Sequence, residues 1–408
     1  MHVNCLKCKG RLFCGRDFCP LKAKQRNFMP IAKKVNKIKE DVSSIATAPF
    51  IGHSNYPNVK MSLLAPIEKD DEYYDSPQVW SEKNYGIEKL AGIRYSLLNS
   101  VSKQENFVDN LKLSAMSRKP VDTELKLKSK PVLRMENDDV NAPHGPSAEV
   151  KRMELTSNPK IPRKVDYLAT DPYVKANQAV VDLYKKFKDE NYASKILSVG
   201  TLGMKKDEKI VPTRWSITAT DDIVSKEIIQ KIKNYRQADY MSFFGGYLGN
   251  YFLVMIMPDA FSYELFETYM PNVSWNQSSQ VQYTTDYEFY NGRKEYAHNC
   301  AGGYYAARLG VVEKMEEMKI QGSVIVIRVI TGEYAMPLGV WVVREAVRKA
   351  MKSAPIRFSD REYLLKYGKA LVKKKFGYDT EHILKASKIL ENKQKKLTSF
   401  IRGYQVPQ

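Results

Sequence analysis

Four of the five cysteines lie within the first 19 residues, as Cys5, Cys8, Cys14 and Cys19. A Cys-x2-Cys pair presents two thiolates to one ion, and two further cysteines nearby complete a tetrahedron. Zn2+ prefers such a closed set of four thiolates, which leaves no open position for catalysis. A segment of about 20 residues cannot bury its own core, so the metal would fold it. We therefore predict a structural zinc site, with two disulfides or an iron–sulfur cluster as alternatives.

Positively charged side chains are interleaved with these cysteines and continue beyond them. Residues 1–40 hold eleven Lys or Arg and two acidic residues, a net charge of +9, whereas residues 361–408 hold twelve and four, a net of +8. The whole chain carries +19, so its middle is nearly neutral. Two basic ends indicate a polyanionic partner, most commonly nucleic acid, although a generally basic surface is the alternative. The candidate nucleic-acid contacts are Lys7, Lys9, Arg11, Arg16, Lys33 and Lys34.

The C-terminal sequence QKKLTSFIRGYQVPQ places two bulky apolar side chains in a polar, basic end. Gln394, Leu397, Phe400 and Ile401 form the pattern Q-x-x-L-x-x-F-I, which resembles the PIP box by which repair and replication factors bind the sliding clamp PCNA. In that mode the three apolar side chains enter the clamp and the glutamine reaches a separate polar pocket. Ile401 departs from the pattern, since a second aromatic residue is common there. Docking of this end on the protein itself is the alternative.

Polar side chains in the central sequence could form a phosphate or metal site. In KIVPTRWSITATDD, apolar and polar residues alternate, which predicts a half-buried strand whose polar face carries Arg214 and ends at Asp221 and Asp222. Arg214 could hold a phosphate, and either aspartate could bind Mg2+ as in a nuclease. Alternatively, an aspartate caps the next helix and Arg214 forms a structural ion pair.

Arginine also appears where little else is polar. Arg328 interrupts the apolar run SVIVIRVI and needs an anionic partner, which could be Glu345, Glu333 or a ligand phosphate. Arg344 lies on a predicted helix, with another arginine one turn further on. If Arg214, Arg328 and Arg344 converge, they form a pocket for a nucleotide or a DNA phosphate. The alternative is an internal ion-pair network.

The segment HNCAGGYY offers two further candidates. Its glycines could bring the backbone N–H groups of a helix start to a phosphate, or they could allow close helix packing. His298 and Cys300 lie two residues apart, which is compatible with a nucleophile and its base. A lone cysteine is more commonly buried as a small apolar residue, so a structural role is the alternative.

The surrounding sequence predicts the elements that position these residues. GNYFLVMIMP and GSVIVIRVI are nearly all apolar, which is typical of central strands covered on both faces. AGGYYAARLGVVEKMEEMKIQG, between them, predicts a helix closed by Gly322, and GVWVVREAVRKAMKS predicts another. We expect an α/β or α+β fold with one dominant mixed sheet flanked by helices, a small N-terminal zinc knuckle and a helical C-terminal region.

Length and composition indicate two or three domains. We expect a cysteine head at 1–24, an N-terminal region at 25–165, an α/β core at 166–392 and a tail at 393–408. The N-terminal region should begin with a basic amphipathic helix at 25–47. No stretch reaches the roughly 18 apolar residues that span a membrane, and the N-terminus has no signal-peptide core. The chain should therefore be soluble, cytoplasmic and associated with the nucleoid.

Six segments, in this order, resemble the archaeal Nre family: PFIGHSNYPNV, DSPQVW, NPKIPRKVD, IVPTRWSITATDD, AGGYYAARLGVVE and PLGVWVVREAVR. The resemblance extends from Cys5 to Ile401. It implies a DNA-repair factor with an N-terminal four-cysteine zinc motif and a C-terminal PIP motif, recruited by PCNA. The residues leave open whether the core is an enzyme acting on DNA or a nucleotide, or a non-catalytic adaptor. RNA metabolism is a third option, because basic charge does not distinguish RNA from DNA.

Overall fold

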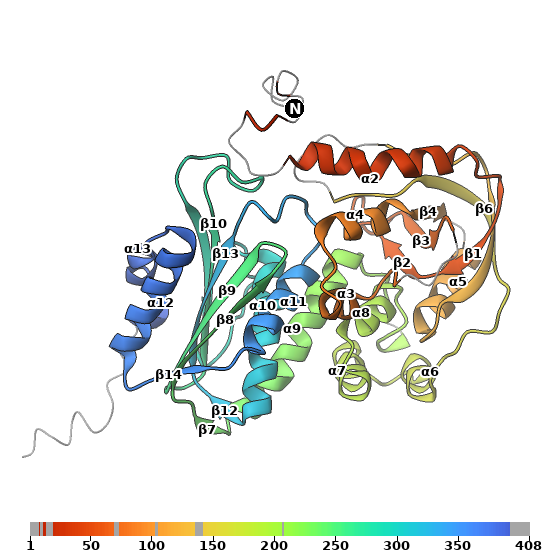
Figure 1. Ribbon diagram of the computed structural model, residues 1–408. Helices are drawn as coiled ribbons and strands as arrows, with labels where there is room; N and C mark the ends of the chain where they lie inside the picture. The colour runs from red at the N-terminus through yellow and green to blue at the C-terminus, as the bar shows by residue number, and fades with distance from the viewer. Residues whose placement is uncertain are drawn as a thin grey trace, which may run out of the picture.

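The computed structural model describes residues 8, 11–13, 19–68, 73–102, 105–134, 142–205 and 208–391. Two six-stranded sheets lie side by side, with helices packed between them (Figure 1). The predicted mixture of sheet and flanking helices is confirmed, but the protein has two large sheets where the sequence predicts one. Within the described ranges, no helix is both long and apolar enough to cross a membrane.

The first sheet is built from the N-terminal half of the chain. It lies in the order β1-β5-β6-β4-β3-β2, and all neighbours are antiparallel except β4 and β6. Burial alternates strictly along β5, so one face of this sheet covers a core and the other meets solvent. Its strands are β1 (Asp41–Ala46), β2 (Ala48–Ile51), β3 (Met61–Pro66), β4 (Leu97–Ser102), β5 (Val121–Leu127) and β6 (Ser147–Leu155).

The first helices pack around this sheet and beside it (Figure 1). They are α2 (Pro20–Val35), α3 (Pro77–Glu82), α4 (Ile87–Tyr95), α5 (Glu105–Met116), α6 (Arg163–Thr170), α7 (Ala176–Phe187) and α8 (Glu190–Ser198). The predicted basic helix at 25–47 is confirmed only in its first part. It ends at Val35, and β1 follows because residues from Val42 to Ala46 alternate toward the core.

The second sheet lies in the order β11-β10-β13-β9-β8-β14. Only β10 and β13 are parallel neighbours. Almost every residue of β9 and β13 is buried, which confirms the prediction of central strands covered on both faces. The strands are β8 (Tyr240–Tyr247), β9 (Asn250–Met257), β10 (Ser262–Tyr269), β11 (Gln282–Glu288), β13 (Ser323–Ile330) and β14 (Ile356–Phe358); β7 (Arg236–Gln237) and β12 (Ile320–Gln321) form a separate short pair.

Helices cover both faces of the second sheet. Val254 and Val326 belong to the core shared with α10 and α11, whereas Leu253 and Ile327 belong to the core under α12 and α13. The helices are α9 (Thr213–Ile232), α10 (Ala301–Met318), α11 (Trp341–Met351), α12 (Arg361–Phe376), α13 (Glu381–Lys385) and α14 (Lys388–Glu391). Both predicted helices of this region are confirmed, although α10 is closed by a left-handed Lys319, φ 55°, and not by Gly322.

The segment that the sequence predicts as a half-buried strand is instead the first half of α9. Pro212 stands immediately before this helix, where proline is favourable. The buried positions repeat every three or four residues, which is the helical period. They are Ser216, Thr220, Asp221, Val224, Ser225, Ile228, Ile229 and Ile232. Because the first of them are polar, a search for apolar periodicity misses this face. Asp221 and Asp222 therefore lie inside a helix and cap no helix start.

Candidate functional site

Three helices, α9, α10 and α11, begin at one edge of the second sheet. A Cβ added at Gly302, in the first turn of α10, would lie 3.2 Å from Thr218 of α9 and 3.0 Å from Val340, the residue before α11. Val347 lies against Gly310 further along, so α10 and α11 run in the same direction. This edge is where the parallel strands β10 and β13 end. Helix starts carry partial positive charge, and ligands of α/β sheets bind at such an edge.

Exposed side chains from three distant segments meet near this edge, and we name them the aromatic–arginine cluster: His53, Tyr56, Arg214, Trp215 and Tyr296. The first two lie in the loop between β2 and β3, the next two in the first turn of α9, and the last before α10. Arg214 Nη1 lies 3.4 Å from His53 Nε2, and the Tyr56 and Trp215 rings are 5.2 Å apart. Burial raises the pKa of Tyr296, and the nearby charge of Arg214 opposes that rise.

Polar contacts fix the loops that carry the cluster. The N–H of Ile51 donates to Thr213 Oγ1 at 2.8 Å, which ties β2 to the start of α9. Arg293 donates to the backbone carbonyl oxygen of Tyr287, on β11, at 2.7 Å and to two carbonyl oxygens of its own loop at 3.3 and 3.1 Å. The N–H of Ala297 donates to the Tyr305 hydroxyl at 2.9 Å. The exposed side chains are therefore presented by anchored backbone, which is what a precise binding site needs.

Arg214 is exposed and lacks a carboxylate partner among the residues that the structure describes; its side chain meets the His53 ring. A guanidinium group in this setting offers planar N–H donors to an incoming anion. The rings around it are accessible as well, since Tyr56 is 43% exposed and Trp215 is 45% exposed. The predicted phosphate role of Arg214 stays a prediction that its exposed guanidinium group allows. The residue lies on a helix and not on a strand.

Arg344, the second predicted pocket residue, lies in a closed ion-pair network. Its Nη1 lies 2.8 Å from both carboxylate oxygens of Asp221, and its Nε lies 2.8 Å from Glu190 Oε1. Arg348 also pairs with Glu190, at 3.0 Å. Burial alone would raise the pKa of Glu190, but Arg348 and Arg344 lower it to about 2. Arg344 is 2% exposed and cannot reach a ligand, so the internal-network alternative is the one that the geometry supports.

Arg328, the third, is also internal. Its Nη1 contacts Glu267, and its Nε donates to Asn250 Oδ1 at 3.1 Å. The carboxylates proposed from sequence lie elsewhere: Glu345 pairs with another arginine at 2.7 Å, and Glu333 accepts a tyrosine hydroxyl at 2.9 Å. The three arginines therefore do not form one pocket, because two of them are held separately inside the core.

Arg308, which the sequence analysis did not single out, anchors Asp222. It is 0% exposed; its Nη1 donates to the two oxygens of Glu288 at 2.8 and 3.1 Å, and its Nη2 reaches Asp222 Oδ1 at 2.5 Å. Asp221 and Asp222 are thus each engaged by a buried arginine. Among the described residues, no group of three or more His, Cys, Asp or Glu is placed to hold a metal ion. The Mg2+ hypothesis for this pair therefore finds no support.

The backbone at the start of α10 is engaged by protein groups: the N–H of Ala301 donates to the carbonyl oxygen of Ala297 at 2.8 Å, and that of Gly303 to the carbonyl oxygen of Cys300 at 3.1 Å. Asp286 Oδ2 accepts the N–H groups of Asn299 and Cys300 at 2.9 and 2.8 Å. Gly303 leaves space that the Glu267 carboxylate fills, so this glycine serves close packing. Burial raises the pKa of the Cys300 thiol, and His298 lies on the surface. A nucleophilic pair at these two positions is not formed.

The cysteine head is described only in part. Cys8 and Cys19 belong to the described residues, whereas Cys5 and Cys14 lie outside them. The N–H of Phe13 donates to Cys8 Sγ at 3.3 Å. The predicted set of four zinc ligands stays a prediction, because two of the four cysteines lie outside the described residues.

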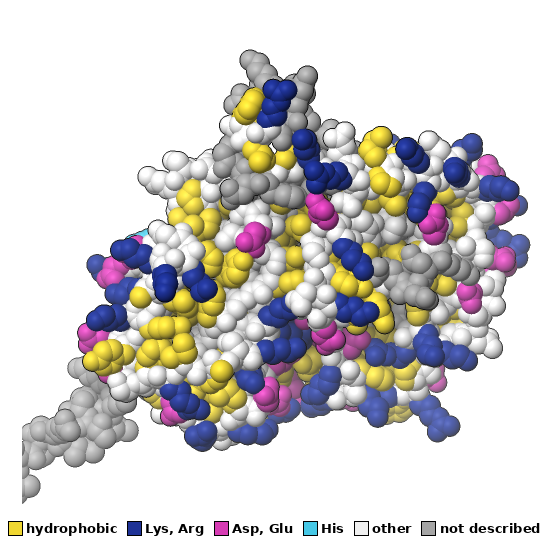
Figure 2. Space-filling model, in the orientation of Figure 1, with side chains coloured by type: hydrophobic (Ala, Val, Ile, Leu, Met, Phe, Trp, Pro, Cys, Tyr) yellow, Lys and Arg dark blue, Asp and Glu magenta, His cyan; other side chains and the backbone are white. Residues whose placement is uncertain are grey.

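Some of the predicted DNA- and clamp-contact residues also belong to the described residues, and the others lie outside them. Lys33 and Lys34 are exposed on α2, where Lys34 pairs with Glu68 at 2.6 Å, and Arg11 is exposed. In Figure 2, Lys and Arg side chains lie along α2 and the lower rim, with acidic side chains between them. Outside the described residues lie Lys7, Lys9, Arg16, Gln394, Leu397, Phe400 and Ile401.

Comparison with known proteins covers nearly the whole chain. Residues 13–276 match the model of Archaeal Nre, N-terminal, and residues 288–400 match Archaeal Nre, C-terminal. The chain is 33% identical over 372 residues to DNA repair protein NreB of Archaeoglobus fulgidus, covering 90% of this chain and 92% of that protein. It is 37% identical over 367 residues to DNA repair protein NreA of the same organism, covering 87% and 90%.

A third relative comes from another archaeon. DNA repair protein NreA of Haloferax volcanii is 32% identical over 324 residues, covering 76% of this chain and 77% of the relative. No solved structure matches the chain. The two family models together span most of the sequence. The three relatives are more than 30% identical to the chain over most of their length. The chain therefore belongs to the archaeal Nre family.

Proposed function

We propose that this chain is a DNA-repair protein that holds DNA at the aromatic–arginine cluster while its C-terminal tail recruits it to a sliding clamp. Its relatives are named DNA repair proteins. The single observation that carries the proposal for this chain is the placement of Arg214. It is an exposed guanidinium without a carboxylate partner among the described residues, set among accessible aromatic rings at a helix start.

Each part of the cluster suits one part of a nucleic-acid strand. Arg214 and the partial positive charge at the start of α9 suit a phosphate, since both attract negative charge. Tyr56, Trp215 and Tyr296 suit bases, because an aromatic ring stacks on any unpaired base, with about 1–3 kcal/mol per base. Bases within a paired duplex are already stacked. The cluster therefore favours single-stranded or locally unpaired DNA.

The two ends of the chain have different roles in this proposal. The Q-x-x-L-x-x-F-I pattern in residues 394–401 would bind PCNA, and the four-cysteine head would hold Zn2+ and add positive charge along the DNA. Arg328 and Arg344 are internal, so no catalytic role is assigned to them. A protein that binds DNA and the clamp fits these observations better than an enzyme built on those arginines. Association with the nucleoid would follow from the same binding.

Fluorescence anisotropy with a labelled single-stranded oligonucleotide tests the DNA-binding proposal. The double variant Arg214→Gln/Trp215→Ala should lose at least about tenfold in affinity, because it removes one phosphate contact and one stacking ring. The matched control Arg152→Gln/Tyr363→Ala alters an exposed arginine and an exposed tyrosine elsewhere, and should bind like the wild type. Equal affinity of both double variants would contradict the proposal.

Clamp recruitment has its own test, in calorimetry with purified PCNA. Phe400→Ala should weaken binding by more than about 2 kcal/mol, as removal of a central aromatic anchor does. Tyr404→Ala, outside the Q-x-x-L-x-x-F-I pattern, serves as the control. Undiminished clamp binding by Phe400→Ala would exclude this tail as the clamp ligand, and would leave the DNA-binding proposal standing.

A further inference from the structure

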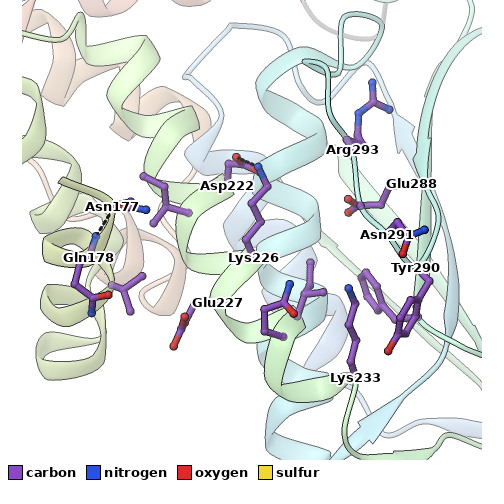
Figure 3. Close-up of a pocket in the computed structure, with 16 residues that line it drawn as sticks. Asn177, Gln178, Asp222, Lys226, Glu227, Lys233, Glu288, Tyr290, Asn291 and Arg293 are labelled. Atoms are coloured by element: carbon purple, nitrogen blue, oxygen red, sulfur yellow. Dashed lines mark hydrogen bonds and ion pairs between the residues drawn. The ribbon is translucent and has the colours of Figure 1, made fainter. Parts of the chain in front are cut away.

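A cavity of about 430 Å³, lined by both polar and apolar side chains, lies between α7, α9 and the segment that follows β11 (Figure 3). A cavity of this volume is large enough for one nucleotide-sized ligand and too small for a duplex. Gln178 lies on the α7 wall, Lys226 and Lys233 on the α9 wall, and Tyr290 and Asn291 on the opposite wall. The walls thus come from three elements, which gives the cavity a fixed shape.

The chemistry of the walls matches a nucleobase. Four carboxamide side chains line the cavity, namely Asn177, Gln178, Gln230 and Asn291. A carboxamide has both donors and an acceptor, which is what the hydrogen-bonding edge of a base requires. Gln178 already donates to Asp182 at 3.0 Å, and Asn177 accepts the Gln178 N–H at 2.9 Å, so each of these two has only part of its hydrogen-bonding capacity left. Ile229 and Phe261 add buried apolar surface. Tyr290 is 45% exposed and so presents a ring on which a base could stack.

One cation of the cavity is not committed to a carboxylate. Lys226 pairs with Asp222 at 2.7 Å, and Arg293 pairs with Asp286 at 3.1 Å. Lys233 instead lies over the Tyr290 ring, with its Nζ 4.5 Å from the centroid, and within the described ranges no carboxylate pairs with it. An ammonium group that lies over one face of an aromatic ring and has no carboxylate partner suits a nucleotide phosphate close to that ring.

The cavity and the aromatic–arginine cluster are neighbours on the same two elements. Asp222 lines the cavity and lies eight residues after Arg214 on α9. At the rise of an α-helix, the two residues are about 12 Å apart along the helix axis. On the facing side, Arg293 lines the cavity and donates to the carbonyl oxygen of Tyr296 at 3.1 Å. At about 3.4 Å per stacked nucleotide, a strand held at the cluster reaches the cavity within three or four nucleotides.

We propose that this cavity takes one nucleotide that has left the base stack of DNA held at the cluster, an inference that rests on the proposed function. The base lies on Tyr290, its edge meets the carboxamides, and its phosphate approaches Lys233. Extruding a base from a duplex costs a few kcal/mol, and least for a mismatched, damaged or unpaired base. The cavity therefore selects DNA at the position of a defect without reading its sequence.

The experiment compares two labelled duplexes of the same sequence, one fully paired and one with a single unpaired 2-aminopurine. The wild type should bind the second at least about tenfold more tightly, with a change in 2-aminopurine fluorescence as the base stacks on Tyr290. Tyr290→Ala should abolish both the preference and the fluorescence change, and should keep the affinity for the paired duplex. Tyr363→Ala, which removes an exposed tyrosine from α12, should behave like the wild type.

A preference that survives in Tyr290→Ala, or the absence of any preference in the wild type, overturns the inference. If the wild type binds neither these duplexes nor the single-stranded oligonucleotide, the proposed DNA-binding function fails, and a titration with free dAMP, followed by NMR, decides about the cavity alone. Shifts that Tyr290→Ala removes would then support nucleotide binding by the cavity. Unchanged spectra at millimolar dAMP would exclude it.

Discussion

The buried arginines and the exposed Arg214 use the same side chain for opposite purposes. Arg308 and Arg344 are almost completely buried, and each is bonded to two carboxylates. Arg214 lies on the surface and meets only a histidine ring among the described groups. A buried guanidinium must be neutralised, because an unpaired charge inside a protein is very costly. Where an arginine keeps its hydration and no carboxylate satisfies it, its charge remains available to a ligand.

The buried network also explains how the exposed cluster is positioned. Glu190 on α8 and Asp221 on α9 both bind Arg344 on α11, and Arg348 links them to Glu313 on α10 at 2.7 Å. Four helices are therefore fixed relative to one another by directional bonds. Because the starts of α9 and α10 carry or adjoin the cluster, this network holds the surface in place without touching a ligand.

The largest expected effect is a loss of stability, and it tests the role of the buried arginines. Arg344→Met leaves Asp221 and Glu190 buried with fewer partners, so the free energy of unfolding should fall by about 3–5 kcal/mol. Urea denaturation followed by circular dichroism measures it. Arg214→Met, at the surface, should change the same quantity by less than about 0.5 kcal/mol. Similar losses in both variants would show that the two environments do not differ as described.

The dependence of stability on pH also tests the buried ion-pair network. The folded protein lowers the pKa of Glu190 from an ordinary 4.5 to about 2, because Arg348 and Arg344 outweigh its burial. The unfolded chain therefore takes up this proton first as the pH falls. The stabilisation is fully present above about pH 4.5 and is lost toward pH 2, a difference of about 3 kcal/mol.

Glu190→Gln removes that titration. Its free energy of unfolding should be lower than that of the wild type at pH 7, and should decrease less between pH 5 and pH 3. Denaturant unfolding at several pH values gives both quantities. Parallel curves for the two proteins would mean that Glu190 carries no such linkage. Glu333→Gln, at an exposed glutamate, is the matched control and should follow the wild type.

Much of the second sheet is predictable from sequence, and the reasons are physical. β9 and β13 are apolar on both faces because helices cover both, and no other soluble arrangement suits such runs. The first half of α9 was predicted as a strand because its buried face holds Ser216, Thr220 and Asp221. These polar residues face partners that are distant in the chain. Single-sequence patterns do not contain that information.

Of the residues in the aromatic–arginine cluster, only Arg214 was predicted from sequence as a site residue. Arg214 was identified, but Arg328 and Arg344 were grouped with it, since the partners that neutralise them, Glu267 and Glu190, lie 61 and 154 positions away. The ring residues Tyr56 and Trp215 are 159 positions apart and meet only in the fold. The available signal was the coincidence of aromatic and basic residues in loop-like segments, HSNYP and PTRW.

Among the exposed residues of the aromatic–arginine cluster, Trp215 should contribute most to DNA affinity. Trp215→Ala should weaken binding to single-stranded DNA by about 1–3 kcal/mol, because the ring stacks on a base. Its effect on a fully paired duplex should be smaller, since those bases are not available for stacking. Anisotropy titrations of both DNAs test this, with Tyr363→Ala as the control at an exposed ring. Equal losses for both DNAs would point to a loss of shape at α9 and not to stacking.

The smallest effect concerns Arg214 alone, and it distinguishes a phosphate contact from a structural one. Arg214→Gln keeps the length and polarity of the side chain but removes its charge. If the guanidinium neutralises one phosphate of single-stranded DNA, the slope of log affinity against log salt should become shallower by about 0.7. Between 50 and 200 mM salt this amounts to a difference of only about threefold, so the slope must be measured over several salt concentrations.

Arg152→Gln provides the comparison, because Arg152 is exposed and already paired with Glu154. It should leave the slope unchanged, although the two substitutions alter the net charge equally. A slope that changes by the same amount in both variants would mean that only the overall charge matters. A slope that changes in Arg214→Gln alone assigns the released counterion to this residue, since Arg152 has a carboxylate that satisfies it and Arg214 does not.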